Sequence, residues 1–414
     1  MKLNYLDFEE ACEKTFTTID SLKKSNKKEI ISIFESLDRV LSKDIKANKN
    51  LPSFNNSAMD GYAFKYNQNI FEFKILDTIF AGDKKDFQEL KDNECYKIMT
   101  GAKVPNCADS IIAFERTIYS DDKRIEIPKD YKKHSNLRLK GEEIKEDETI
   151  LIKGQKLNSS HIALLASQGI TMVEVYSNIE IAIISTGNEL KEPWENAKED
   201  EIYNVNALSI SSLLKEQGLN SKYLGVIPDN LEKQIEYIKD LKNFDLIITS
   251  GGISMGEADF LAKAFLENGL EIIYHGVNLK PGRAMLFGKL DNSLLLSLPG
   301  NPLAAIINAY IFLKPILNKM QNSNEIYQDY IKVINKEEFF VKERRVEAVL
   351  GKIINGEFFA TKNNKYGSGM ISLLKDSNAL FISGGNTSNI KKEEEIKVIE
   401  FNCNFSSKKT NFIN

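Results

Sequence analysis

Glycines and carboxylates are concentrated at one strand-to-helix junction of the sequence, residues 245–259. The apolar run Leu246–Thr249 is typical of a buried strand in a parallel sheet and leads into Ser250-Gly251-Gly252. Because glycine lacks a Cβ atom, the backbone N–H groups of this turn can approach a phosphate closely at the start of the following helix. Glu257 and Asp259 would repel a bare phosphate, which indicates a cation between the protein and its ligand. The alternative is an ordinary strand-to-helix turn with a solvated helix N-terminus.

Two further acids follow predicted strands of the same block. Glu189 closes the turn 185–189 after a strand, where a doubly wound sheet places its ligands, so its carboxylate could reach a cation or a ligand hydroxyl. Asp229 lies in the turn 228–230 after the next predicted strand. The alternatives are a solvated acid at position 189 and a routine turn or helix N-cap at position 229.

Lys280-Pro281-Gly282-Arg283 places two cations around one turn. Proline and glycine fix the backbone there, so Lys280 and Arg283 can be aimed at one phosphate; a solvated basic turn is the alternative. The rigid turn LPGNP at 298–302 includes Pro299 and Asn301 and precedes an apolar helix. Such a backbone either has a purely structural role or preorganises a binding site.

Polar residues that suit a ligand site also occur in the segment 51–145. Asp60 precedes Gly61 in a cluster of small and polar residues, an arrangement poorly suited to plain packing, which suggests a ligand role. Thr100, in a glycine-containing turn, can donate to an oxyanion or cap its own turn. Arg138 lies among acids in 136–143, where ion pairing at the surface is the alternative to a ligand role.

Length and composition indicate a globular protein of several domains. A chain of 414 residues is too long for one compact core. Its 42% hydrophobic and 28% charged residues are typical of soluble proteins, and a net charge of −4 gives no overall attraction to nucleic acid or anionic membranes. Residues 1–11 do not resemble a signal peptide, and the longest apolar stretch, 303–313, is too short to span a bilayer. We therefore predict a cytoplasmic protein that binds neither nucleic acid nor membrane.

Cysteine and histidine offer little for catalysis. The four cysteines form no CxxC pair, and the three histidines lie in no recognisable motif. Zinc or iron–sulfur sites and structural disulfides are therefore not indicated. Chemistry is expected to rest on carboxylates, a divalent cation, Lys and Arg side chains, and backbone N–H groups.

Local patterns divide the chain into regions of different secondary structure. Residues 1–48 are predicted to be mostly helical, with an amphipathic helix at Glu29–Leu41, and 49–145 to form short strands between turns. Alternation over 179–323 predicts a doubly wound α/β domain, and β-like runs over 324–414 predict a small barrel or sandwich. The α/β block is expected to contain strands at 181–185, 222–226, 246–249, 271–274, 283–290 and 293–297, and helices at 206–217, 231–241, 258–267 and 303–313.

Taken together, these segments resemble one family, the molybdopterin molybdenumtransferases of the bacterial MoeA type, related to the E domain of gephyrin. The matching strings occur in the family's order: NSAMDGYA (56–63), IMTGA (98–102), LRLKGEEI (137–144), STGNEL (185–190), TSGGISMGEAD (249–259), KPGR (280–283) and LPGNP (298–302). The sequence departs from the family at three positions: Arg283 stands where Lys is common, Asn230 replaces a frequent acid, and Glu143 stands where Asp is common.

The resemblance implies insertion of molybdenum into the pterin dithiolene. Adenylylated molybdopterin and molybdate would give molybdenum cofactor and AMP, with assistance from Mg²⁺. By this analogy the acids of the catalytic and metal site are Asp60, Glu189, Asp229 and Asp259. The substrate site would include Thr100, Arg138, Ser250, Gly251, Gly252, Lys280, Arg283, Pro299, Asn301 and Ser368.

The resemblance also implies a fold and partners. An extended domain built from 1–48 and 146–178 would be interrupted by the mostly β insertion domain 49–145 and followed by the α/β domain 179–323 and a C-terminal β-barrel 324–414. Such proteins are usually elongated homodimers, with a cleft shared between the β insertion of one subunit and the α/β domain of the other. The preceding adenylyltransferase and downstream molybdoenzymes would be further partners.

Three other interpretations share parts of this pattern. The adenylyltransferase of the preceding step has a related α/β domain, but GEAD after the glycines and the β insertion with DGYA favour the molybdenumtransferase. A non-catalytic scaffold or carrier for molybdopterin is compatible with the fold, although the intact acids at 60, 189 and 259 argue against it. A tungsten-selective version of the enzyme is compatible with the same residues.

Overall fold

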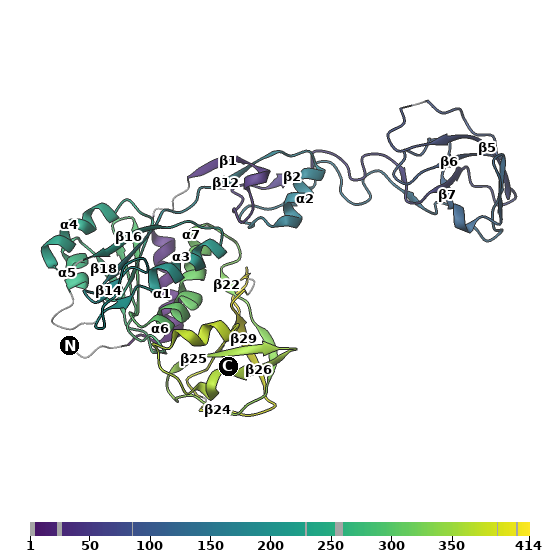
Figure 1. Cartoon of the computed structure of the whole chain (residues 1–414). Coiled ribbons are helices and arrows are strands. Elements are labelled where there is room, and N and C mark those ends of the chain that lie inside the picture. The colour runs from purple at the N-terminus through teal and green to yellow at the C-terminus, as the bar shows by residue number, and fades with distance from the viewer. Residues whose placement is uncertain are drawn as a thin grey trace. The chain divides into compact units, whose positions relative to one another are not determined.

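The computed structural model describes residues 5–22, 27–84, 86–227, 230–252, 260–386, 388–402 and 405–414 (Figure 1). The chain forms two compact units. The first, which we call the insertion unit, contains residues 44–152 and 163–171; the second, the main unit, contains 1–43, 153–162 and 172–414. Each unit is described by itself.

A sheet of short strands forms most of the insertion unit. The strands follow the order β7-β4-β6-β5-β9-β8. Their bounds are Gly61–Phe64 (β4), Glu72–Ile79 (β5), Glu94–Ile98 (β6), Ser110–Ala113 (β7), Tyr119–Ser120 (β8) and Arg124–Glu126 (β9). All residues of β4 are buried. Glycine is required at position 61, because a Cβ atom there would lie 1.9 Å from the carbonyl oxygen of Ile112 on β7.

Short strand pairs complete the insertion unit. β2 (Ile45–Lys46) pairs with β11 (Thr149–Leu151), β3 (Asn56–Ser57) pairs with β10 (Leu137–Arg138), and a 3₁₀ turn, η2, spans Phe114–Arg116. The division between the two units falls within helix α2 (Ser159–Ser167). The mostly β character predicted for residues 49–145 is confirmed.

The main unit begins with helix α1 (Phe8–Ser21), but the helix predicted at Glu29–Leu41 is wrong. In its place β1 (Lys28–Ser32) pairs with β12 (Met172–Tyr176), and a 3₁₀ turn, η1, spans Ile33–Glu35. The β-branched side chains of Ile30 and Ile31 favour an extended backbone. Apolar residues at helical spacing occur on both sides of Ser32, and this spacing suggested one helix. The Ser32 side chain instead accepts the N–H of Phe34 and begins the 3₁₀ turn η1.

The α/β sheet of the main unit has the order β16-β13-β17-β21-β20-β18. Its strands are β13 (Ile181–Thr186), β16 (Lys222–Ile227), β17 (Leu246–Ser250), β18 (Glu271–His275), β20 (Leu286–Leu290) and β21 (Ser293–Leu298). β16, β13, β17 and β21 are parallel, and β20 is antiparallel to both of its neighbours. A small parallel pair, β14 (Leu190–Lys191) and β15 (Ile202–Tyr203), follows β13.

Helices cover both faces of this sheet. Ile181 and Ile183 enter an apolar cluster with residues of α1, α3 (Asn206–Glu216) and α6 (Pro302–Asn308). Ala182 and Ile184, on the opposite face, enter a second cluster with residues of α4 (Leu231–Leu241) and α5 (Phe260–Glu267). Because successive side chains of a strand point to opposite faces, one β13 sequence supplies both clusters. The predicted doubly wound α/β domain is thus confirmed (Figure 1).

Two element boundaries of the α/β domain differ from the prediction by three residues or more. β20 starts at Leu286, because Arg283 belongs to a turn in which its carbonyl accepts the N–H groups of Val277 and Met285. The apolar helix continues beyond residue 313, since α6, a π-helical turn η3 (Ala309–Leu313) and α7 (Lys314–Met320) follow without a break. This helix is long and apolar enough to cross a membrane by length and composition, but 78% of its apolar window is buried, as in the core helix of a globular domain.

A closed β-barrel forms the C-terminal part of the main unit. It consists of β23 (Ile331–Asn335), β25 (Val346–Ile354), β26 (Glu357–Ala360), β27 (Ala379–Ile382) and β29 (Glu395–Glu400), and it closes because β25 pairs with both β26 and β27. Of the predicted barrel and sandwich, the barrel is therefore the one formed. Smaller elements accompany it: β22 (Tyr327–Gln328) with β30 (Phe405–Ser406), β24 (Phe339–Phe340) with β28 (Asn389–Ile390), and the turns η4 (Thr361–Asn364) and η5 (Ile371–Asp376).

One strand of the α/β domain joins the barrel. β19 (Leu279–Lys280) lies between β18 and β20 in the chain, yet it pairs in parallel with β25, with Lys280 opposite Glu347. The loop that follows β19 is therefore anchored to the barrel.

Candidate functional site

The ends of adjacent parallel strands align at one edge of the α/β sheet. Ser185 on β13 is paired with Ser250 on β17, which is paired with Leu298 on β21. β13 lies between β16 and β17, so the next strands in the chain are added on opposite sides of β13 and the strand order reverses there. Ligands of doubly wound proteins bind outside the carboxyl ends of the strands at such a point. The turns that directly follow these strands, at STGNEL, Gly251-Gly252 and LPGNP, therefore share one edge.

The glycine turn after β17 packs directly against the end of β13. Gly251 and Gly252 both have positive φ angles, 82° and 64°. A Cβ atom on Gly252 would lie 2.5 Å from the hydroxyl oxygen of Thr186. That hydroxyl is buried and has no hydrogen-bond partner among the described residues. Glycine is thus needed for both conformation and close approach, and a donor remains available beside the turn.

Glu189 is the acid that the described residues place at this edge. Its exposed side chain folds back over Gly187, where a Cβ atom would lie 2.9 Å from both carboxylate oxygens. Asp229 and Asp259 lie outside the described residues, as does Glu257. Within the described part of the chain, no three His, Cys, Asp or Glu side chains form a group that could hold a metal ion.

A buried polar network organises the loop that bears Glu189. The Asn204 amide donates to the Tyr223 hydroxyl over 2.7 Å and to the Ser185 hydroxyl over 3.2 Å, and Tyr223 in turn donates to Glu192. Burial and the bond to Glu192 raise the pKa of Tyr223, so the phenol stays protonated as a donor. The network joins β13, β16 and the Glu189 loop.

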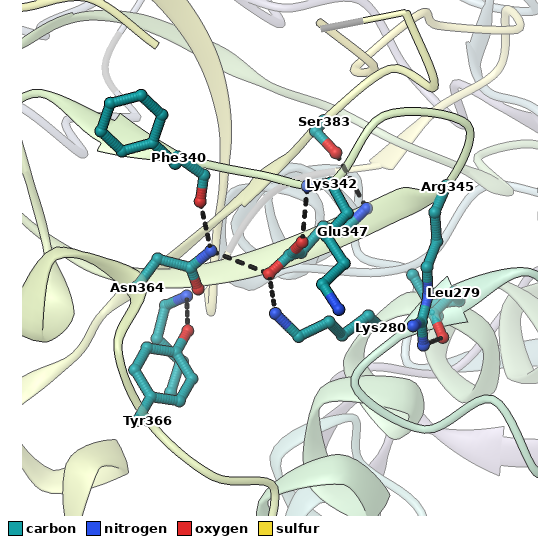
Figure 2. Close-up of polar contacts among 10 residues, drawn as sticks. Leu279, Lys280, Phe340, Lys342, Arg345, Glu347, Asn364, Tyr366 and Ser383 are labelled. Carbon is teal, nitrogen blue, oxygen red and sulfur yellow. Dashed lines mark hydrogen bonds and ion pairs between the residues drawn. The ribbon is translucent and has the colours of Figure 1, made fainter. Parts of the chain in front are cut away.

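The KPGR turn lies between the α/β domain and the barrel. Lys280 forms an ion pair with Glu347 of β25, as Figure 2 shows. Gly282 has a φ of 92°, and a Cβ atom there would lie 1.9 Å from the amide nitrogen of Asn308, which donates to the carbonyl of Pro281. Proline and glycine therefore fix this turn against α6, as its sequence suggests.

Arg345 is a basic neighbour of this turn that the sequence interpretation missed. Its guanidinium donates to the carbonyl of Leu279 over 2.8 Å, and the Arg283 guanidinium lies over the ring of Tyr5 at 4.3 Å. Burial and the charge of Arg283 lower the pKa of Arg345. The two guanidinium charges thus raise the positive potential beside this turn, which favours a bound anion. The only sequence signal is the basic pair 344–345 before a strand.

The LPGNP turn contacts the barrel through Ser368. The Asn301 amide donates to the Ser368 hydroxyl over 2.9 Å, and the Ser368 carbonyl accepts the N–H of Ala304. Asn206 of α3 donates to the carbonyl of Gly300 over 2.8 Å. Pro299 thus lies in a turn held from both sides. The structure brings Ser368 to the α/β domain although it lies far from it in sequence.

In the insertion unit, Asp60 and Thr100 form one hydrogen-bonded pair. The Thr100 backbone N–H and hydroxyl each donate to Asp60 Oδ1 over 2.7 Å. These two bonds, the backbone one first, lower the pKa of the exposed Asp60 carboxyl. The carboxylate is therefore charged at neutral pH, and no hydrogen bond is recorded for its second oxygen among the described residues.

Arg138 lies beside the same loops of the insertion unit. β10 places Arg138 directly opposite Asn56 of β3, and Lys103 lies opposite Asn56 on its other side. The turn that bears Thr100 is tied to β3 as well, because the Gly101 N–H donates to the carbonyl of Ser57. Asp60, Thr100 and Arg138 are thus gathered by one small set of strands. Lys103 is a second cation that the sequence interpretation missed.

Known proteins match this chain along nearly its whole length. Residues 6–169 match the model of the MoeA N-terminal region (domain I and II), 182–319 that of the probable molybdopterin binding domain, and 332–401 that of the MoeA C-terminal region (domain IV). A molybdopterin molybdenumtransferase of Staphylococcus epidermidis is 34% identical over 386 residues, which cover 89% of this chain and 90% of that protein. The chain belongs to the molybdopterin molybdenumtransferase family.

Further comparisons agree with this membership. A molybdopterin molybdenumtransferase of Haemophilus influenzae is 34% identical over 300 residues, which cover 72% of this chain and 74% of that protein. The crystal structure of a molybdopterin biosynthesis moeA protein from Pyrococcus horikoshii OT3 superposes with a TM-score of 0.83 at 25% identity, covering 96% of this chain and 100% of that one. The protein is thus a transferase of molybdenum cofactor biosynthesis, in a family that acts on molybdopterin and molybdate, and the predicted resemblance is confirmed.

Proposed function

We propose that the chain inserts molybdenum from molybdate into adenylylated molybdopterin and releases AMP. The observation that carries this proposal is the alignment of Ser185, Ser250 and Leu298 at one sheet edge. The alignment brings an acid-bearing loop, a glycine turn and the LPGNP turn together at the point where doubly wound folds bind their ligands. Family membership supports the reaction class.

The proposed roles follow from charge and hydrogen-bonding capacity. Cleavage of a phosphoanhydride beside a dithiolene leaves negative charge on the departing phosphate, and cations and N–H groups stabilise that charge. We assign the backbone around Ser250, Gly251 and Gly252 to a phosphate group, and Lys280 and Arg283 to phosphate or molybdate oxygens. The remaining substrate contacts are assigned to Thr100, Arg138, Pro299, Asn301 and Ser368.

Magnesium is proposed as the cation, and the described acids suit it. Mg²⁺ prefers oxygen ligands and usually keeps several waters, so carboxylates can hold it directly or through those waters. Among the described residues the exposed carboxylate of Glu189 has no ion pair or hydrogen bond, and bonds from Thr100 lower the pKa of the Asp60 carboxyl. We propose that these acids, with Asp229 and Asp259, hold Mg²⁺, which when bound would neutralise phosphate charge.

A homodimer is proposed from an exposed apolar face of the main unit. Ile30, Phe34, Leu37 and Met172 are all exposed, and Phe34 is 93% exposed. Side chains of this kind in one region mark interaction surfaces, and two-fold dimers are the commonest homo-oligomers. We further propose that each site uses residues of both subunits and that the chain has the four domains predicted from the sequence. We also propose that the protein works in the cytoplasm. There an adenylyltransferase would supply its substrate and molybdoenzymes would receive its product.

AMP release from adenylylated molybdopterin, measured with and without molybdate and Mg²⁺, tests the proposed reaction. Release that requires both additions is expected. Tight binding of the pterin without AMP release would contradict the reaction and indicate a carrier or scaffold. Equal or faster turnover with tungstate would instead indicate the tungsten-selective alternative.

A further inference from the structure

Glu347 is a buried carboxylate at the junction of the barrel and the KPGR turn. Only 1% of the residue is exposed. Figure 2 shows three donors around its carboxylate: the Lys280 ammonium, the Asn364 amide at 2.8 Å from Oε1, and the Lys342 backbone N–H at 3.1 Å from Oε2. A buried charge is tolerated only when it is paired and hydrogen-bonded in this way.

Lys280 is held by both its backbone and its side chain. Its backbone lies opposite Glu347 in the pairing of β19 with β25, and its ammonium reaches the same residue. The Lys280 side chain is about one-third exposed, whereas that of Glu347 is enclosed. An ammonium has three N–H donors, so the bond to Glu347 leaves capacity for a second, anionic partner on the exposed side.

The segment that carries Asn364 has an unfavourable backbone conformation. Lys362, Asn363 and Asn364 have φ angles of 47°, 49° and 59°. This region costs Lys362 about 1 kcal/mol, and although Asn adopts it more readily, three such residues in succession need contacts to hold them. The Asn364 amide donates to Glu347 and to the carbonyl of Phe340. The barrel thus maintains strain in a segment whose contacts fix the orientation of the Glu347 carboxylate.

We propose that Glu347 is a positioning residue, which holds the Lys280 ammonium in place for an anionic group of the substrate without touching the substrate. The inference rests on the proposed function, which assigns Lys280 to phosphate or molybdate oxygens. It also gives the barrel a task in the reaction: β25 supplies both the strand that pairs with β19 and the acid that orients its lysine.

Positioning and simple electrostatics predict different effects on kcat when the negative charge is removed. If Glu347 merely lowers the local positive potential, Glu347→Gln should tighten the binding of anions and leave kcat unchanged. If Glu347 positions Lys280, the substitution should lower kcat, because a displaced ammonium no longer meets the charge that develops on the reacting group. A loss of roughly tenfold to hundredfold is expected for a misplaced group of this kind.

The test compares full-length Glu347→Gln, Glu347→Asp, Lys280→Ala and the double variant Lys280→Ala/Glu347→Gln. Steady-state AMP release gives kcat and KM, and calorimetry with molybdate alone gives anion affinity. We expect Glu347→Gln to lower kcat with unchanged or tighter molybdate binding, and Glu347→Asp, which keeps the charge, to recover part of the loss. In the Lys280→Ala background, Glu347→Gln should have no further effect on kcat.

Tyr366→Phe is the matched control for the barrel itself. Tyr366 donates no bond to Lys280 or Glu347; its hydroxyl accepts the backbone N–H of Leu350 in the same region. This variant should leave kcat unchanged even if the loss of that acceptor lowers its thermal stability, which separates a destabilised barrel from a displaced Lys280. Should Glu347→Gln fail to fold, Glu347→Asp still tests positioning, because it keeps the charge and shortens the reach to Lys280. Positioning predicts a lower kcat for it, and simple electrostatics predicts a normal kcat.

The outcomes separate this inference from the proposed function. Multiplicative losses in the double variant, or a normal kcat in Glu347→Gln, would overturn the positioning role while leaving Lys280 as a substrate residue. A normal kcat in Lys280→Ala would overturn the assignment of Lys280, and absence of AMP release in the unmodified protein would overturn the reaction itself.

Discussion

The charged form of the Asp60 carboxylate is favoured by a single neighbour, Thr100. Both donors of Thr100, its N–H and its hydroxyl, reach the same oxygen of Asp60, which lowers the pKa of that carboxyl. A group with a lowered pKa in the native state stays charged as the pH falls to values at which a free Asp begins to protonate. This matters for a residue proposed to hold a cation.

Thr100→Val should raise the pKa of Asp60, because it removes the hydroxyl bond and keeps the backbone bond. As the pH falls, the variant should then lose AMP release at a higher pH than the unmodified protein, with activity near neutral pH less affected. Titration of the Asp60 carboxyl by NMR checks the pKa directly. An unchanged pKa would show that the hydroxyl contributes nothing to the ionisation of Asp60.

Gly252→Ala should cost more stability than Gly269→Ala. Both glycines have positive φ angles, so alanine costs about 1–2 kcal/mol at either position. Only at Gly252 does the added Cβ also meet another atom, the Thr186 hydroxyl at 2.5 Å, whereas nothing lies within 4 Å at Gly269. Denaturant unfolding of the two variants measures the difference. Equal losses would contradict a close approach of the glycine turn to β13.

Site residues that belong to short sequence motifs could be predicted from the sequence, whereas the residues that contact them from distant parts of the chain could not. The KPGR and LPGNP turns were identified because proline and glycine act on their own neighbours. Arg345, just before β25, and Glu347, within it, look like ordinary residues, and only the pairing of β19 with β25 brings them to Leu279 and Lys280. Asp229 and Asp259 remain predictions, because they lie outside the described residues.

Helix α4 shows how one residue sets the start of an element. Asn230 is its N-cap, and the side chain accepts the N–H of Lys233 over 3.0 Å. The position where the family frequently has an acid is thus occupied by another good capping residue, since Asn and Asp cap helices equally well. The change from the family pattern preserves the helix start.

Asn230→Ala should lower the free energy of unfolding by about 1 kcal/mol, because the Lys233 N–H loses its acceptor. Asn230→Asp should keep the stability, since the carboxylate caps the same group. Urea unfolding of both variants measures the effect. A loss as large in Asn230→Asp as in Asn230→Ala would rule out capping as the role of this side chain.

The elements that could be predicted are those in which the spacing of apolar residues in the sequence corresponds to one buried face of a helix or strand. Leu231–Leu241 was predicted with the bounds that α4 has, because its apolar face repeats with the helical period. The helix predicted at 29–41 fails because the same spacing there joins a strand to a 3₁₀ turn, and the pairing of β1 with the distant β12 is not a local signal. Tertiary pairing overrides local pattern in that segment.

At the scale of the whole molecule, the exposed apolar face of the main unit predicts self-association. Phe34→Glu should weaken the dimer by at least about tenfold, because a charge would be buried at the interface without a partner. Leu266→Glu, at an exposed position on α5, is the matched control and should leave the dimer intact. Sedimentation equilibrium gives both dissociation constants. An unchanged dimer in Phe34→Glu would exclude this face as the interface.

Sites shared between subunits should show complementation. Asp60→Ala and Asp259→Ala homodimers should each be inactive, and mixed, reassociated dimers should regain part of the AMP release, because one site of each heterodimer then has both acids. Differently tagged subunits allow heterodimers to be isolated. Inactive heterodimers would place each complete site within one subunit.

The way β19 is inserted into the barrel has a consequence for synthesis on the ribosome. The α/β domain is translated before the barrel, so when the growing chain has emerged to residue 323 its sheet can form, but the KPGR turn still lacks β25. Lys280 acquires its partner only after Glu347 has been made and the barrel has closed. A nascent or prematurely terminated chain therefore lacks both the partner of Lys280 and the barrel side chains, such as Val346 and Leu350, that complete the apolar core beneath the α/β sheet. Translation of the barrel is thus needed before the KPGR turn and this core can be completed.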